Sequence, residues 1–217
     1  MAIFSYDSKF SRVVMRISHG CYLNLLWFVC SIPIVTIGAS TCALYAVALK
    51  VAKDEEGDIT RQFFDAFRSN FKQATQLWLI LCVAGVVLGL DIYILTRLQA
   101  ATTGVMAVVL TLALALVIVG CIVLAIELMY VFPLVAYVEN TNVAMLKNAL
   151  LIGTHYLFCT ICVFGIHALM AIAIIAIFTP LIVFGEGVCA VLSSYLLNPV
   201  LRASATPQDN EDARRLP

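Results

Sequence analysis

The chain has 217 residues, of which 63% are hydrophobic and only 12% are charged, and its mean hydropathy is +1.02. Soluble domains carry about 25% charged residues, so this composition excludes a water-soluble globule. The formal net charge is zero and no basic run is present, which excludes a nucleic-acid partner as the expected function. A lipid bilayer is therefore the expected solvent of most of the surface.

Long apolar segments follow one another along the chain and predict an all-α, polytopic transmembrane helix bundle. They are Tyr22–Ile37, Thr41–Ala52, Ala74–Leu95, Val105–Val138, Tyr156–Ile177 and a last segment that follows Thr179-Pro180 and ends near Leu201. We expect one transmembrane helical domain over residues 1–201 and a flexible polar tail over residues 202–217. The first twenty residues are long for the n-region of a cleaved leader, so we expect the first segment to be retained.

The positions of the basic residues distinguish six crossings from five, because cytoplasmic loops of membrane proteins are enriched in Lys and Arg. If Tyr22–Ile37 and Thr41–Ala52 form a hairpin, six crossings put both termini in the cytoplasm, and twelve of the 13 Lys and Arg residues lie inside with only Arg97 outside. If Tyr22–Ala52 is one bent crossing, five crossings result and the split becomes nine to four. The hairpin is preferred, with a re-entrant hairpin as its alternative because Thr41–Ala52 is short for a span.

Amphipathic stretches lie between the apolar segments. Residues spaced i, i+3 or i+4 form apolar stripes at Phe10, Val13, Val14 and Ile17, and again at Phe63, Phe64, Phe67 and Phe71, and Asn140–His155 is a third, less regular candidate. Such helices either lie in the headgroup plane or pack against the bundle as ordinary cytoplasmic helices.

The phenylalanine stretch carries further expectations. Asp58 is expected to cap its helix, and Asp65 and Arg68 are spaced for an i,i+3 ion pair. Its aromatic and basic faces make it a candidate docking surface for a partner protein, with these residues as the candidates: Arg61, Phe64, Phe67 and Arg68.

The turns of the first and last hairpins share a spacing. Pro33, Gly38, Cys42 and Ala43 are matched at the same offsets by Pro180, Gly185, Cys189 and Ala190. Interrupted segments in matching places point to binding sites in transporters, so Pro33, Gly38, Pro180 and Gly185 are candidate functional positions. A chance match between two apolar stretches is the alternative.

An ionisable residue within a span costs about 2.5–3.5 kcal/mol at mid-membrane, so each one needs a reason. Asp91 and Glu127 are expected to reach the membrane interfaces, and Glu186 is expected in an exposed outer turn. His167 is expected at membrane depth, where a hydrogen bond to a neighbouring helix accounts for it. The alternative is proton transfer by His155, His167 or Glu127, which predicts a membrane-embedded enzyme.

One cluster has the composition of a metal site. His155, Cys159 and Cys162 fall at i, i+4 and i+7 of one predicted helix, and imidazole plus two thiolates suits Zn²⁺ or copper. No second cluster supplies a fourth ligand, so helix packing is the preferred interpretation and no metal is assigned. The other cysteines lie in or beside apolar segments and are expected to act as small hydrophobic residues. No catalytic or nucleotide-binding motif occurs, so the sequence predicts no catalytic residues and no cofactor.

Two ordered blocks of the sequence carry a resemblance to a known family. Asn24–Ile80 contains Asn24-Leu25-Leu26-Trp27, Pro33–Gly38, Ala43-Leu44-Tyr45, Asp54–Gly57 and Asn70–Ala74, and Tyr130–Leu150 contains Phe132-Pro133 and Lys147-Asn148-Ala149. With these blocks the chain resembles the bacterial YesL family of multispan membrane proteins of unknown function. The resemblance implies a protein of the bacterial cytoplasmic membrane, often encoded beside genes for carbohydrate uptake and degradation, and it supplies no catalytic residues.

The expected function is therefore that of a non-enzymatic integral membrane protein, an accessory or transport-related component associated with carbohydrate uptake. Its expected partners are the lipid bilayer and a carbohydrate uptake permease, and the link to carbohydrate comes from the resemblance alone. A membrane-embedded enzyme and a structural or regulatory membrane partner are the alternatives.

Overall fold

The computed structural model describes residues 9–55, 57–176 and 182–204, and every regular element in this part of the chain is a helix. The helices are α1 (Lys9–Ser31), α2 (Ile37–Val51), α3 (Ile59–Ala100), α4 (Val105–Val135), α5 (Asn142–His155), α6 (Leu157–Ala176) and α7 (Ile182–Ser204), with the 3-10 turn η1 (Ile34–Thr36) between α1 and α2. The predicted all-α class is confirmed for the described residues.

The first two apolar segments form an antiparallel helical hairpin, α1–α2, rather than one bent helix. At its turn, the Thr36 hydroxyl donates to two carbonyl oxygens at 2.6 and 2.7 Å, and the hydroxyls of Ser31 and Ser40 are hydrogen-bonded at 2.6 Å. At the opposite end, one guanidinium nitrogen of Arg16 lies 2.8 and 2.7 Å from the two carboxylate oxygens of Asp54. Contacts at both ends hold the two helices side by side.

The phenylalanine stretch is not a separate helix but the first part of α3, which runs without a break for 42 residues, and of the two alternatives the structure shows packing against the bundle. Phe63 is fully buried, and its ring stacks with that of Phe67 at 6.4 Å between centroids, whereas Phe64 is exposed. The helix begins as predicted, because the Asp58 carboxylate accepts a hydrogen bond from the backbone N–H of Arg61 at 3.1 Å. This part of α3 is held by the core of the molecule itself.

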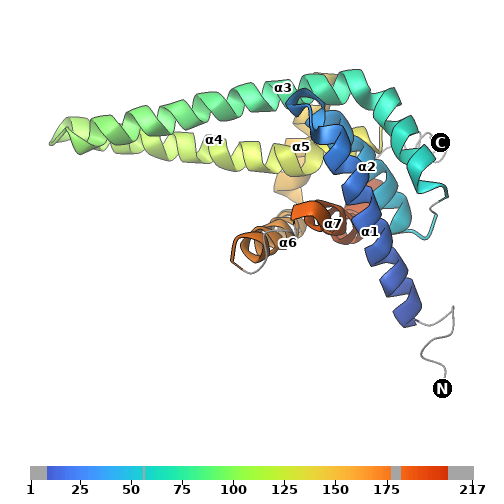
Figure 1. Ribbon diagram of the computed structural model, residues 1–217. Coiled ribbons are helices and arrows are strands. Elements are labelled where there is room, and N and C mark those ends of the chain that lie inside the picture. Colours follow the sequence, from blue (N-terminus) through green and yellow to red (C-terminus); the bar gives the residue numbers. More distant parts are fainter. Residues whose placement is uncertain (1–8, 56, 177–181, 205–217) are drawn as a thin grey trace.

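Beyond this region, α3 and α4 project from the other helices as a long antiparallel pair (Figure 1). We call residues 82–124 the arm. Its two helices contact each other where Leu88 lies against Gly120, and near the far end Gln99 donates to the Thr111 hydroxyl at 2.9 Å. The α3 part of the arm is about 28 Å long at 1.5 Å per residue, close to the thickness of a bilayer's hydrocarbon core.

The last turns of α4 differ from the arm because they are buried. Tyr130 is fully buried, and its hydroxyl is hydrogen-bonded to that of Thr160 in α6 at 2.8 Å. Gly153 of α5 approaches Ile126 and Tyr130 so closely that a β-carbon there would collide with the Ile126 side chain. The apolar run from Val105 is longer than one span because its end belongs to the protein core.

α7 crosses α1 at two glycines. Gly187 lies against the backbone carbonyl of Gly20, and its own N–H donates to the side-chain oxygen of the fully buried Asn24 at 2.7 Å. Further along, the Arg16 guanidinium lies over the Tyr195 ring, 5.3 Å from its centroid. These contacts make α1 and α7 antiparallel neighbours.

Within the described residues, four segments rather than six are long and apolar enough to cross a membrane: Ile34–Val51, Ile59–Ala100, Val105–Val135 and Leu157–Ala176. Helices α1 and α7 are not among them, so the expected six crossings are not confirmed. The protein buries 61% of the Ile34–Val51 segment, but only 6% of the apolar windows of α3 and α4 and 17% of that of α6. Figure 1 shows α6 nearly end-on while the arm lies across the view, so the helices do not form one parallel bundle.

Candidate binding pocket at the ends of α4, α5 and α7

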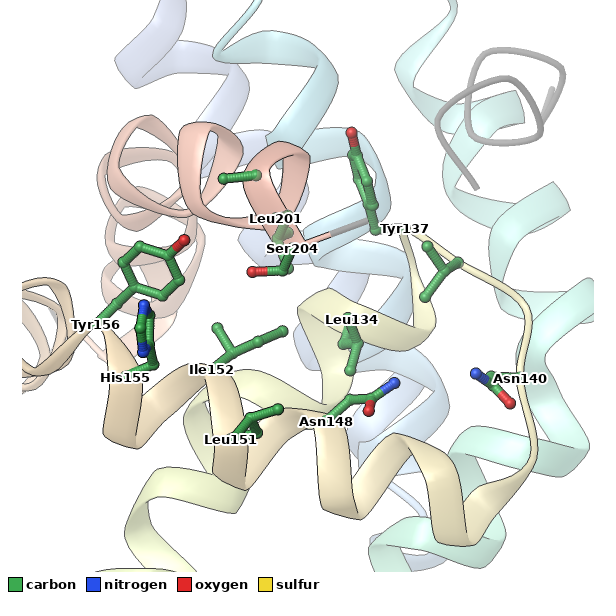
Figure 2. Close-up of a pocket in the computed structure, with 12 residues that line it drawn as sticks. Leu134, Tyr137, Asn140, Asn148, Leu151, Ile152, His155, Tyr156, Leu201 and Ser204 are labelled. Atoms are coloured by element: carbon green, nitrogen blue, oxygen red, sulfur yellow. The ribbon is translucent and has the colours of Figure 1, made fainter. Parts of the chain in front are cut away.

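A pocket of about 340 Å³ opens between the end of α4, helix α5 and the end of α7 (Figure 2). Its apolar lining consists of Leu134, Val138, Leu151, Ile152, Leu201 and Ala203. Its polar lining consists of Tyr137, Asn140, Asn148, His155, Tyr156 and Ser204. This volume lies within the range of small-molecule sites, which is about 300–1,000 Å³.

The α4–α5 connection forms one wall of the pocket and is fixed by α3. The side-chain amide of Gln73 donates to the backbone carbonyl of Asn140 at 2.6 Å, and that of Asn142 donates to the side-chain oxygen of Gln76 at 2.9 Å. The Thr141 hydroxyl caps α5 by accepting from the N–H of Ala144 at 3.4 Å. The wall is thus set by bonds between residues far apart in the sequence.

The opposite wall is formed where the chain leaves α5. Tyr156 has φ −102° and ψ 53°, which are not helical angles, so α5 ends at His155 and α6 begins at Leu157. The rings of His155 and Tyr156 meet edge to face with centroids 4.8 Å apart, and Figure 2 shows both on the side away from Tyr137 and Asn140. A local break in the helix therefore places two aromatic rings at the pocket.

Because of this break, the metal candidates His155, Cys159 and Cys162 do not have the predicted spacing along one helix. His155, Cys159 and Cys162 do not share one helix, and no group of three metal-ligating side chains occurs among the described residues. Cys159 is buried, with its thiol 3.7 Å from the Leu196 carbonyl of α7, whereas His155 lines the pocket. All eight cysteines are free thiols.

Among the described residues that line the pocket, the polar groups are two amides, three hydroxyls and one imidazole. Nearby, the Lys53 ammonium lies 5.3 Å from the centroid of the Tyr137 ring, which holds that ring in place. An apolar floor with amide and hydroxyl donors and acceptors suits a small molecule that itself carries hydroxyl or amide groups.

A second polar cluster lies between α2, α6 and α7. His167 Nε2 is 3.7 Å from a carboxylate oxygen of Glu186 and 3.5 Å from the Tyr45 hydroxyl, and Nδ1 lies 2.9 Å from the Val163 carbonyl. Because a carbonyl only accepts, Nδ1 is the donor there. The expected hydrogen bond of His167 to a neighbouring helix is confirmed by Tyr45 of α2. The expectation that Glu186 is simply exposed is wrong, because its carboxylate faces this imidazole.

Glu127 also differs from its expected place. We expected it at an interface, but it is only 7% exposed, and one of its carboxylate oxygens has no hydrogen-bond partner among the described residues. The expectation failed because the end of α4 is covered by other helices, so distance along the helix does not measure distance to water.

The two candidate histidines do not share a site. His155 ends α5, and His167 lies ten residues into α6, about 15 Å from its start along the helix axis. Direct proton transfer needs hydrogen-bond contact or one bridging water, so these residues do not act on the same group.

The predicted functional turns have different surroundings. A β-carbon at Gly38 would lie 2.5 Å from the Ala74 carbonyl oxygen and from the Trp78 β-carbon, and Trp78 Nε1 donates to the Ile34 carbonyl at 2.9 Å. At Gly185, the nearest atoms belong to the flexible Met170 side chain at 3.0 Å. Pro33 precedes η1, and Pro180 lies outside the described residues. Gly38 therefore serves close helix packing, and Gly185 does not repeat that contact.

The predicted docking residues are divided between the core and the surface. Phe67 packs partly against the core, and Phe64, Arg61 and Arg68 are exposed. The predicted pair of Asp65 with Arg68 is replaced by an Arg61–Asp65 contact of 3.7 Å. An exposed docking surface at this place would therefore consist of Arg61, Phe64 and Arg68 without Phe67.

Sequence reasoning missed the pocket. Asn148, Leu151, Ile152 and His155 share one face of α5 at helical spacing, but the rest of the lining comes from α4, the α4–α5 connection, Tyr156 and α7, and no periodic pattern joins those segments to α5. The sequence feature that could have indicated the pocket was the presence of Tyr137, Asn140 and Asn148 close together within the second block of the family resemblance, Tyr130–Leu150. Polar side chains gathered at the end of an apolar run indicate a polar lining, but not which helix covers it.

Residues 21–92 match a family model described as a protein of unknown function, DUF624. No curated protein and no solved structure matches the chain.

The matched segment covers the second half of α1, all of α2 and the greater part of α3, including the first residues of the arm. It contains Asn24, Gly38 and Trp78, which hold the hairpin, α3 and α7 together. The pocket residues lie beyond it. The match therefore concerns the packed framework and the beginning of the arm, and the long apolar helices identify a membrane protein of unknown function.

Proposed function

We propose that the protein is a non-enzymatic accessory component of the bacterial cytoplasmic membrane that associates with a carbohydrate uptake permease through its arm. The link to bacteria and to carbohydrate rests on the resemblance to the YesL family, and that relationship is part of the proposal. The observation that carries an accessory role is the arm itself, whose apolar surface lies almost wholly outside the protein's own core.

One outer surface of the arm favours a protein neighbour over lipid alone. A glycine on a membrane helix lets another helix approach closely. Gly85 of α3 faces the arm's own α4, because a β-carbon added there would lie 3.5 Å from the Leu124 side chain, so Gly85 is not part of this surface. An added β-carbon at Gly89 meets no atom within 4 Å, which leaves a flat surface for another helix.

The orientation is also proposed, with both termini in the cytoplasm. The expected inner residues Arg16 and Lys53 lie at one end of the fold, where they contact Tyr195 and Tyr137. Arg97, the expected outer residue, is near the far end of the arm, and its guanidinium lies over the Tyr93 ring at 5.3 Å. Basic residues concentrate on the cytoplasmic side of membrane proteins, which supports this direction.

The proposal is tested by co-purification of the tagged protein in mild detergent, with the permease detected by mass spectrometry. We expect Gly89→Leu to reduce recovery of the permease about tenfold, which corresponds to about 1.4 kcal/mol. Gly165→Leu on α6 is the matched control, because a β-carbon there also meets nothing within 4 Å. Purification of the wild-type protein alone, together with unchanged sugar uptake after gene deletion, would refute the proposal.

A membrane-embedded enzyme is the second candidate, and the cluster of His167, Glu186 and Tyr45 is the observation that favours it. An imidazole between a carboxylate and a hydroxyl can move a proton. Glu186→Gln separates the two candidates, because it would abolish an enzyme's turnover and leave recovery of the permease unchanged.

A further inference from the structure

A second cavity, of about 530 Å³, lies between the α2–α3 connection and the end of α7. Lys53 lines the cavity from the connection, and Arg202 lines it from the last turn of α7. Tyr195, which precedes Arg202 in α7, also lines it. Two basic side chains from segments far apart in the sequence therefore line one cavity.

The described charges around this cavity have a positive balance. Arg16 lies over the Tyr195 ring at 5.3 Å and reaches both carboxylate oxygens of Asp54. Lys53 and Arg202 add two further positive charges at the lining itself. Lys50 and Glu55 of the same region form an opposite-charge pair, so the described charges here still leave the basic groups in excess, and this field favours an anion.

The floor of the cavity is built rather than loose. Asn198 lines it, is only 8% exposed, and donates from Nδ2 to the Leu49 carbonyl of α2 at 3.1 Å. Its side-chain oxygen has no hydrogen-bond partner among the described residues. This bond ties the end of α7 to the end of α2, so the backbone segments that carry the two lining cations are held next to each other.

The surroundings of the cavity favour a lipid over a soluble anion. Leu192, Tyr195, Pro199 and Arg202 are spaced i, i+3, i+7 and i+10, so they share one face of α7. At the start of this face Leu192 is exposed, and Ile17 of the neighbouring α1 is also exposed. An exposed apolar surface therefore lies next to the basic cavity. This arrangement matches a phospholipid, in which an acyl chain is joined to a charged headgroup.

We propose that this cavity binds the phosphate of an anionic phospholipid headgroup. Lys53 and Arg202 contact the phosphate, and an acyl chain lies along the α7 face that begins at Leu192. Basic pockets at the cytoplasmic ends of membrane helices bind such headgroups. The inference rests on the proposed cytoplasmic orientation of this end of the fold, but not on the association with a permease.

The test measures binding of phosphatidylglycerol to the purified full-length protein in detergent, by native mass spectrometry and by thermal unfolding. We expect phosphatidylglycerol to bind and to raise Tm more than phosphatidylcholine, whose headgroup carries no net charge. The double variant Lys53→Gln/Arg202→Gln should bind phosphatidylglycerol about thirtyfold more weakly, because each basic residue near an anionic surface contributes about a fivefold factor.

Two controls keep the result specific. Arg61→Gln/Arg68→Gln removes two exposed charges elsewhere and should leave binding unchanged, and Arg202→Lys should retain most of it. Equal binding by the double variant and the wild type would overturn the proposal. Equal protection by inorganic phosphate would overturn the lipid assignment and indicate a soluble phosphate compound instead.

Discussion

The crossing of α1 and α7 at Gly187 gives the sharpest test of the fold. In Gly187→Ala, the new methyl group would collide with the Gly20 carbonyl oxygen and would lie 2.8 Å from the Asn24 β-carbon and 2.9 Å from the Asn24 nitrogen. Two of these atoms belong to the backbone of α1, so no side-chain rotation relieves the collision. The helices must separate.

Three effects change the free energy of unfolding of Gly187→Ala, two of them unfavourable and one favourable. Overpacking of a buried contact costs about 1–3 kcal/mol. Separation also stretches the 2.7 Å hydrogen bond from Gly187 N–H to Asn24, and a buried polar group without its partner costs about 1–3 kcal/mol. Alanine is the better helix former by about 1 kcal/mol. We therefore expect Gly187→Ala to lower the free energy of unfolding by about 1–5 kcal/mol.

The measurement is thermal or denaturant unfolding of the purified variants in one detergent, followed by circular dichroism. Gly165→Ala is the matched control, because its methyl group meets nothing within 4 Å and only the helix-forming gain remains. It should be as stable as the wild type or more stable. If Gly187→Ala unfolded at the same temperature as Gly165→Ala, the close crossing of α1 and α7 described here would be wrong.

Two further predictions concern the hairpin turn and the metal candidates. Trp78→Phe keeps an aromatic ring but removes the 2.9 Å hydrogen bond to the Ile34 carbonyl, so we expect a loss of about 1 kcal/mol in detergent unfolding, and no loss would show that this bond does not hold the turn. Cys159→Ala should leave the zinc and copper content of the purified protein unchanged by elemental mass spectrometry, because the break at Tyr156 separates Cys159 from His155. A metal lost only in this variant would contradict that separation.

Several elements were predictable because their causes are local. The run from Val105 and the run after Tyr156 predicted α4 and α6 to within a few residues, since uninterrupted apolar sequence forms helix in lipid. Pro33 marked the turn of the first hairpin, and Asp58 marked the start of α3, because proline ends a helix and a carboxylate caps one. The membrane class follows from composition alone.

The candidate site was not predictable in the same way. The sequence spacing of His155 and Cys159 is helical, yet Tyr156 breaks the helix to let α5 turn across the end of α4, and this depends on packing around Gly153. Likewise, nothing in the sequence near Lys53 indicates Arg202 as its neighbour. Such contacts join segments far apart in the chain.

The amino-acid sequence by itself determined that this chain is helical, that lipid surrounds much of it, and where its long apolar helices run. Only the tertiary structure decided which apolar faces meet each other and which are exposed, as on the buried end of α4 and on the arm. The physical reason is that lipid-facing and protein-facing sides of a membrane helix are equally apolar, so hydrophobic periodicity does not separate them. Close backbone contacts and buried hydrogen bonds, such as that of Asn24 with Gly187, determine which helix faces pack against each other.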